Sequence, residues 1–420
     1  MGRPLEGYAA SKKGEHRVAT EDDRKGRVKP PSRPRAAPVD ARAEPASDQA
    51  PPRPSRTSIS PLSRSGIPDA PTRSSMPPES RRASSKMSIA TIDFDIVNAA
   101  RRIFEGALSL VPGDRVLLIL DREREGLAVA LAETARTTGA RCDVVFLEDF
   151  GIRPIIELPP PVLTLLEQAQ ASVLLIGIER GEQPMRIQLT DQVVRLRLRH
   201  AHMVGVTRRS LIAGFSVDPT RVLDATRAVR MRLRPDSTLH LKTTGGSDLT
   251  VKLSPKYRWA EHVGVIRPGR WENLPTGELL TTPESVDGVF VCDASIGGHF
   301  VHKGLIDRTP VRLEIAQGVV TRATCVDRAL QRSVEEYLRS EPLAARVGTV
   351  VVGTNVGMLT PIGEMVCDQN LPGLHLSLGN TFSDITGAEP GALSQLTLTT
   401  SGADIDLDGT QLLRAGRYLL

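Results

Sequence analysis

The sequence predicts an α/β protein made of a parallel, layered α/β domain followed by a β-rich α+β domain. Three observations support this. The 420 residues exceed what one hydrophobic core usually serves. Up to about residue 225, apolar strand-like runs alternate with segments of helical period, and beyond it the apolar period changes to two. We therefore expect an extension at 1–86, an N-terminal domain at 87–225 and a C-terminal domain at 226–420.

The extension differs from the rest of the chain in composition. Residues 1–86 hold 14 of the 31 prolines and a single aromatic residue, Tyr8, so we expect this segment to be disordered. They carry 18 Lys/Arg and 10 Asp/Glu, whereas the remaining residues carry 36 and 39. The basic character therefore belongs to the extension. Because the folded part is nearly neutral, we do not expect nucleic acid as a partner.

The first domain shows regular alternation of helix and strand. Apolar residues recur at helical spacing over 94–109, and the continuously apolar run 115–120 is typical of a strand buried on both faces. The turn at 121–126 lacks the glycines of a dinucleotide site. Further helices are expected at 127–137, 161–169 and 189–199, and further strands at 142–147, 172–177 and 202–206.

The second domain begins with a hairpin. Alternating residues at 239–242 and 249–253 flank a turn containing Gly245-Gly246. One helix is expected at 328–339. Further strands are expected at 289–292, 311–315, 319–324, 350–352, 375–378 and 396–400.

Cysteine spacing and hydropathy bear on the location of the protein. The four cysteines form no CxxC pair, which argues against a zinc knuckle or a disulfide framework and fits a reducing cytoplasm. No apolar stretch approaches the roughly 20 residues that a membrane span needs. We therefore expect a cytoplasmic protein without a membrane partner.

Several motifs resemble those of the metal-dependent aminopeptidase T family. The run WENLPTGE at 271–278, followed by TTP at 281–283, resembles the family's hallmark, and GTN at 353–355 and GLHLSLG at 373–379 resemble two later blocks in the same order. The likeness spans about residues 93–420. It implies a dimeric clamshell with two divalent metals in an interdomain cavity, and hence a homodimer.

The resemblance also implies which positions should hold metal ligands. Glu278 and His375 match the first ligand glutamate and a ligand histidine. Because a tight catalytic site needs at least three ligands on one ion, two are too few. We therefore expect no metal, no other cofactor and no catalytic residue. The other family positions, a second glutamate, a tyrosine and a histidine-x-aspartate pair, hold Thr349, Phe382, Ser394 and Leu396.

Two functional hypotheses remain, besides a purely structural dimerising subunit that would bind no ligand in the cleft. The first is a non-catalytic relative that binds a peptide in the cleft, and the chain is also similar, more weakly, to peptide-binding accessory proteins of crocagin-type modified-peptide biosynthesis. The alternative is a metal-dependent aminopeptidase or hydrolase with rearranged ligands, Glu278, His302 and His375. The residues expected to bind the peptide are Glu278, Asn355, His375 and Phe382.

Two other histidine pairs are expected to have no functional role. His200 and His202 stand beside Arg197 and Arg199, which indicates a polar helix end exposed to solvent. Glycines around the pair at 299 and 302 disfavour a helix, and in an extended segment their side chains would point to opposite faces. We therefore do not expect this second pair to replace the missing ligands.

Overall fold

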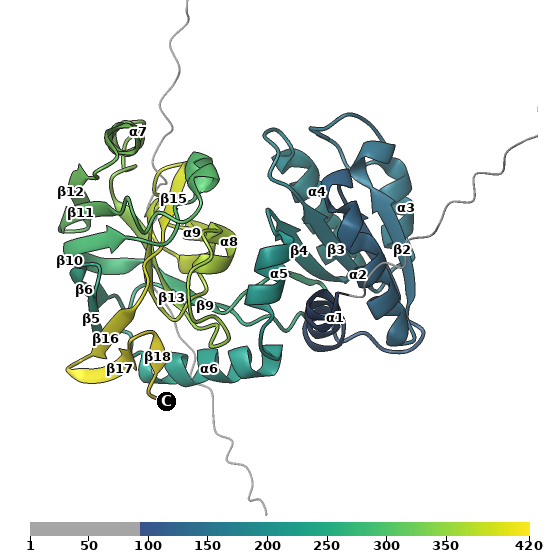
Figure 1. Ribbon diagram of the computed structural model, residues 1–420, viewed down its shortest axis with the longest axis horizontal. Coiled ribbons are helices and arrows are strands. Elements are labelled where there is room, and N and C mark those ends of the chain that lie inside the picture. Colours follow the sequence, from purple (N-terminus) through teal and green to yellow (C-terminus); the bar gives the residue numbers. More distant parts are fainter. Residues whose placement is uncertain (1–92) are drawn as a thin grey trace, which may run out of the picture. The chain divides into compact units, whose positions relative to one another are not determined.

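A five-stranded parallel sheet, sheet A, forms the core of the N-terminal part. The structure, a computed structural model, describes residues 93–420. Sheet A has the order β2-β1-β3-β4-β8, and every neighbouring pair is parallel (Figure 1). This confirms the predicted parallel α/β domain. Its strands are β1 (Arg115–Leu120), β2 (Arg141–Phe146), β3 (Ala171–Ile176), β4 (Arg199–Val204) and β8 (Arg270–Asn273).

Helices cover both faces of sheet A. Alternate residues of β1 point to opposite faces, so Val116 and Leu118 pack with α1 and α2, whereas Leu117 and Ile119 pack with α3 and α4. This double burial explains the continuous apolar run in the sequence. The helices are α1 (Phe94–Arg101), which continues as a π-helix to Ala107, α2 (Glu125–Thr137), α3 (Pro160–Glu167) and α4 (Gln183–Leu196).

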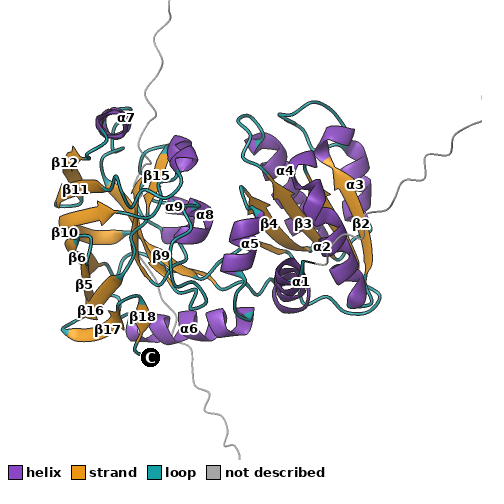
Figure 2. Cartoon of the chain, viewed as in Figure 1, coloured by secondary structure: helices purple, strands orange, loops and turns teal. Residues whose placement is uncertain are grey.

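Two further sheets form the C-terminal part and share one apolar core (Figure 2). Sheet B, of order β12-β11-β10-β6-β5-β16-β17-β18, contains the predicted hairpin. Its strands are β5 (Thr238–Thr243), β6 (Asp248–Leu253), β10 (Pro283–Cys292), β11 (Val311–Ala316), β12 (Val319–Thr324), β16 (Ala403–Leu407), β17 (Thr410–Arg414) and β18 (Arg417–Tyr418).

Sheet C has the order β15-β14-β13-β9-β7, and its neighbouring strands are antiparallel. The predicted strands of this part and the predicted helix, α7 (Arg328–Leu338), are confirmed. The strands are β7 (Ala260–His262), β9 (Glu278–Thr281), β13 (Val347–Gly353), β14 (Gly373–Gly379) and β15 (Gln395–Leu398).

The chain returns to sheet A after the hairpin of sheet B. Strand β8 pairs with β4, with Asn273 opposite His202. After four intervening residues the chain enters β9 of sheet C at Glu278. The Asn-Leu-Pro-Thr-Gly run of the motif is therefore the segment that connects sheet A to sheet C.

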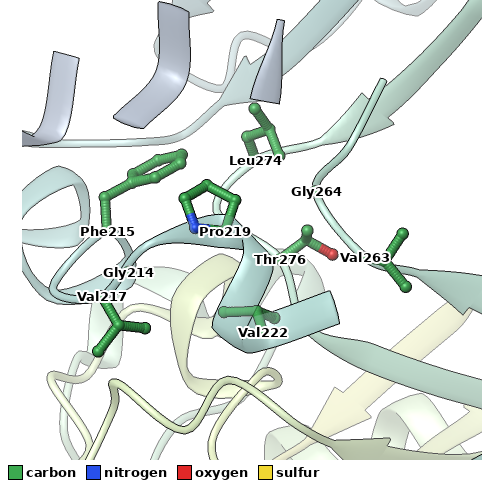
Figure 3. A pocket seen from close by; sticks show the side chains of 9 residues that line it. All are labelled: Gly214, Phe215, Val217, Pro219, Val222, Val263, Gly264, Leu274 and Thr276. Carbon is green, nitrogen blue, oxygen red and sulfur yellow. The ribbon is translucent and has the colours of Figure 1, made fainter. Parts of the chain in front are cut away.

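Close packing fastens this connecting segment to the helices α5 (Arg208–Gly214) and α6 (Pro219–Arg232). A Cβ atom on Gly214 would lie 2.2 Å from Cβ of Pro275, and one on Gly277, whose φ is +134°, would lie 2.7 Å from Val222. A small apolar pocket beside them, of about 10 Å³, has room for about one water (Figure 3). No charged side chain lines it. We therefore assign this pocket to packing.

The predicted extension at 1–86 lies outside the described residues. Within the part of the chain that the structure describes, no helix is long and apolar enough to cross a membrane.

Candidate functional site

A cavity of about 640 Å³ is lined by residues of both sheet A and sheet C. On the side of sheet A, the cavity is lined by side chains of α4 and β4 and by all four residues of β8. On the side of sheet C, it is lined by side chains of β9, β13, β14 and β15. The lining mixes apolar side chains with nearly as many polar and charged ones. Apolar walls with polar groups that orient the ligand are typical of small-molecule and peptide sites. We treat this cavity as the candidate site.

A carboxylate and an imidazole meet at one end of the cavity. His262 of β7 lies opposite Glu278 of β9 in the antiparallel ladder, and its Nδ1 is 2.7 Å from Oε1 of Glu278. The Glu278 side chain is 8% exposed and that of His262 is 32% exposed. Sequence analysis predicted Glu278 but missed His262, because a three-residue strand without a motif gives no signal.

The charges of this pair depend on each other. Burial lowers the pKa of His262, but the hydrogen bond that its ring donates to Glu278 and the charges of Glu278 and Glu272 outweigh burial, so the pKa lies above the usual 6.5. Burial raises the pKa of Glu272, although its carboxylate accepts the backbone N–H groups of Val263 and Gly264. The imidazole at this end therefore carries a positive charge over a wider pH range than a free histidine does.

Replacing Glu278 by glutamine is expected to lower the pKa of His262, because burial then acts with less opposing charge. In the wild type, the raised pKa contributes stability that is fully present below pH 6.5 and is lost as the pH rises through the folded-state pKa. An NMR titration of the His262 ring measures this pKa. The matched control is Glu284→Gln, at an exposed residue paired with Lys252. An unchanged His262 pKa in Glu278→Gln would contradict the assigned pairing.

His375 is buried with both ring nitrogens occupied. Its Nε2–H donates to the carbonyl of Leu371 at 3.0 Å, and its Nδ1 accepts the N–H of Thr400 at 3.2 Å. Burial lowers its pKa to about 4, so the ring is neutral near pH 7. It does not line the cavity. The predicted role of His375 in ligand binding therefore has no support in its contacts, which stabilise the fold.

The other two predicted site residues differ in position. Phe382 lines the cavity and packs against Ala260, Leu280 and Val351. Asn355 is fully buried outside the lining, and its Nδ2 donates to the carbonyls of Gly214 and Thr276 at 2.9 Å each. Asn355 thus holds the segment that connects the two sheets.

The face of sheet C toward the cavity carries neutral polar side chains. Ser377 and Gln395 line the cavity, and the Oγ1 atom of Thr397 lies 2.8 Å from Oγ of Ser377 and 3.0 Å from Nε2 of Gln395. The resemblance placed the two missing ligands at Ser394 and Leu396. Leu396 belongs to the apolar core, so the cavity-facing positions of β15 are the alternate ones, 395 and 397. They too hold no carboxylate or imidazole.

These donors do not fit a tightly bound metal ion. Nδ1 of His262 and one oxygen of Glu278 bind each other, and Glu272 accepts two backbone N–H groups. Across residues 93–420, no group of three or more His, Cys, Asp or Glu side chains is placed to hold a metal.

The alternative ligand set, Glu278, His302 and His375, does not come together at one point of the cavity either. His302 lies in a 3-10 helix, Gly298–Lys303, rather than in an extended segment, and it does not line the cavity. Its Nδ1 is 2.9 Å from the carbonyl of His299. Both ring nitrogens of His375 are already bonded. Glu278 is therefore the one member of the set that faces the cavity.

The prediction that His200 and His202 are exposed at a helix end is wrong. Both lie on β4, where their exposures are 0% and 7%. Oγ of Ser172 is 2.8 Å from Nδ1 of His200, whose Nε2 is 3.3 Å from Nδ1 of His202. The error arose because α4 ends at Leu196 and the strand starts at Arg199, three residues earlier than expected. His202 lines the cavity.

Comparison with known proteins bears on the fold. The structure is similar to AmpT from Thermus thermophilus, with a TM-score of 0.55 and 17% identity over 79% of this chain and 100% of that chain. The chain has the two-domain fold of aminopeptidase T. It is also similar to the 2,5-dihydroxypyridine dioxygenase from Pseudomonas putida KT2440, with a TM-score of 0.53 and 18% identity over 77% of this chain and 96% of that chain.

Sequence comparison gives a narrower match. Residues 216–340 match the family model of NicX, 2,5-dihydroxypyridine 5,6-dioxygenase. No curated protein matches the chain. The aminopeptidase T-like fold is therefore shared with enzymes that have different names and activities, and the function of this chain has to be argued from its own cavity.

Proposed function

We propose that the chain binds a peptide in the cavity between sheet A and sheet C and does not cleave it. The observation that carries this proposal is the combination, in one cavity, of an edge strand, apolar side chains and neutral hydrogen-bonding side chains. An edge strand offers free backbone N–H and C=O groups to an extended peptide, which can add to the sheet as a further strand.

Strand β8 is the edge in question. It ends the order of sheet A, and Arg270, Trp271, Glu272 and Asn273 all line the cavity. The Trp271 side chain is 42% exposed, so it offers apolar surface to a ligand. The opposite wall supplies Phe382 and further apolar side chains. A peptide lying along β8 would therefore gain backbone hydrogen bonds on one side and apolar contacts on the other.

The donor set supports the non-catalytic part of the proposal. Metal-assisted hydrolysis requires several anionic or imidazole ligands that converge on the ion and the water it activates. Here Ser377, Gln395 and Thr397 supply neutral groups that suit amide hydrogen bonds. One carboxylate oxygen of Glu278 already accepts a hydrogen bond from His262.

A metal-dependent aminopeptidase is the second candidate. The observation in its favour is the Glu278–His262 pair, the one place in the cavity where a carboxylate and an imidazole meet. Binding a catalytic ion there would require this hydrogen bond to break and a third ligand to move in. Metal-dependent release of N-terminal residues from a peptide would support this candidate.

A synthetic hexapeptide library, with titration calorimetry of the best binders, tests the proposal. We expect micromolar binding without loss of residues from the peptide. Trp271→Ala is expected to weaken binding about tenfold or more, because a large aromatic contact is removed. The control is Leu393→Ala, at a 93% exposed residue outside the cavity. Absence of binding by every hexapeptide, or equal affinity for Trp271→Ala and wild type, would contradict the proposal.

A further inference from the structure

Two nitrogen-bearing side chains line the wall of the cavity formed by α4 and β4. Arg186 projects from the first turn of α4 and His202 from β4, and both line the cavity. They are close enough that the charge of Arg186 contributes, after burial, to lowering the pKa of His202 to about 4. His202 is therefore neutral near pH 7.

The positive charge of Arg186 is not balanced by a bonded carboxylate. Within residues 93–420, no hydrogen bond or ion pair involves its guanidinium. Glu182 lies one turn away, but its two oxygens bind Arg153 at 2.7 and 2.6 Å. Burial lowers the pKa of Arg186, as expected for a cation partly removed from water without a bonded partner. A bound anion would remove that cost.

The buried histidine chain determines what His202 offers to the cavity. The hydroxyl of Ser172 is fully buried, and its hydrogen bond is to Nδ1 of His200. If this hydroxyl donates, Nδ1 of His200 accepts the hydrogen bond, and the ring hydrogen of the neutral His200 lies on Nε2. Nε2–H of His200 then donates to Nδ1 of His202. The opposite orientation would leave a buried O–H without an acceptor, which costs free energy. The neutral His202 ring then carries its hydrogen on Nε2, as a donor.

We propose that Arg186 and His202 form a carboxylate-binding corner of the cavity. The guanidinium and the Nε2–H group would donate to the oxygens of one carboxylate of the ligand, and the pairing of a charged and a neutral donor suits a single negative charge. The inference rests on the proposed function in that it names a chemical feature of the bound peptide. The carboxylate is either the C-terminus or an Asp or Glu side chain, which share this chemistry.

The corner lies in the same cavity as the Glu278–His262 pair but on the opposite sheet. Strand β4 belongs to sheet A and α4 packs on that sheet, whereas β9 belongs to sheet C. A ligand held at the corner would therefore be anchored to the sheet A side of the cavity. The side chains of β8, next to His202, would then lie along the peptide from its anchored carboxylate. Anchoring of this kind would fix the direction of a peptide that adds to β8.

The experiment compares hexapeptides in three forms: with a free C-terminal acid and no acidic residue, as the C-terminal amide of the same sequence, and as amides that contain Asp or Glu. We expect the acid to bind about tenfold or more tightly than the plain amide if the C-terminus is the source. The acidic amides would show that advantage instead if a side chain is the source. Arg186→Gln should abolish whichever advantage is found.

The matched control is Arg195→Gln, on the same helix, where the arginine side chain is 55% exposed and pairs with Glu167. This variant should keep the advantage of the carboxylate. Equal affinity for all three peptide forms, or an advantage that survives in Arg186→Gln, would overturn the carboxylate corner while leaving peptide binding intact.

A further experiment without peptides tests carboxylate binding by Arg186 and His202 separately from the proposed peptide binding. Sodium acetate is titrated against sodium chloride at constant ionic strength, and the ¹⁵N shifts of the His202 ring are followed by NMR. We expect a saturable shift with acetate in the wild type that is absent in Arg186→Gln. No acetate-specific shift would overturn the corner. If no hexapeptide binds but acetate shifts His202, the proposed peptide binding fails and the corner stands.

Discussion

Replacing Arg153 by leucine is expected to lower the free energy of unfolding by about 3–5 kcal/mol, because it leaves the buried carboxylate of Glu182 without its cation and leaves Asp121 with Arg124 alone. The guanidinium of Arg153 binds Glu182 through Nε and Nη2 and Asp121 through Nη1, at 2.6 to 2.7 Å. The Asp121 and Glu182 side chains are 0% and 1% exposed. Urea denaturation followed by circular dichroism measures the loss.

Two further variants make this result interpretable. Arg136→Leu, which breaks an exposed pair with Glu133, should change stability by less than about 1 kcal/mol. Adding Glu182→Gln to Arg153→Leu should recover part of the loss, because the negative charge of Glu182, which has lost its arginine, is removed, whereas Asp121 keeps Arg124. If Arg153→Leu were as stable as Arg136→Leu, the buried network would not be the main electrostatic support of the carboxyl edge of sheet A.

The second large effect is expected for His375→Leu, with a loss of about 2–5 kcal/mol in the free energy of unfolding. The substitution leaves the carbonyl of Leu371 and the N–H of Thr400 without partners in a fully buried place. Because His375 does not line the cavity, peptide affinity measured well below the unfolding temperature should stay within a few-fold of wild type.

The pH dependence of stability provides a second readout for this variant. Between pH 6.5 and about 4, His375 takes up a proton in the unfolded chain but not in the folded one, so this residue destabilises the wild type as the pH falls. The stability difference between the wild type and His375→Leu should therefore narrow over that range. The control is His299→Leu, at an exposed residue. A variant of unchanged stability that had lost peptide binding would show that His375 acts in the site instead.

The sequence predicted the sheets better than the cavity. The continuously apolar residues of β1 predicted a strand buried on both faces. The alternating residues of β14 also predicted a strand, and this strand is buried on both faces too, because its polar residues His375 and Ser377 are themselves buried. Strands β7 and β8 were missed, since runs of three or four residues, most of them polar, have no detectable period. Both line the cavity, so the weakest local signals coincided with the functional surface.

Motif matching indicated the aminopeptidase T-like fold but not the roles of the residues in the motifs. In the hallmark run, Glu278 faces the cavity, whereas the Leu-Pro-Thr-Gly segment before it packs against α5 and α6. Asn355 and His375, which also lie in matching motifs, hold the backbone through hydrogen bonds. His202 and His262 lie in no motif, and the pairing of β4 with β8 and of β7 with β9 brings them to the cavity.

The central claim is that the cavity binds a peptide through its own side chains and backbone, without a metal. The most direct test is calorimetric titration of the best hexapeptide before and after dialysis of the protein against EDTA, with the metal content of both samples measured by mass spectrometry. We predict well below one metal ion per chain and an affinity that chelation does not change. Stoichiometric zinc, cobalt, manganese or iron, together with loss of binding or of peptide cleavage after chelation, would contradict the account.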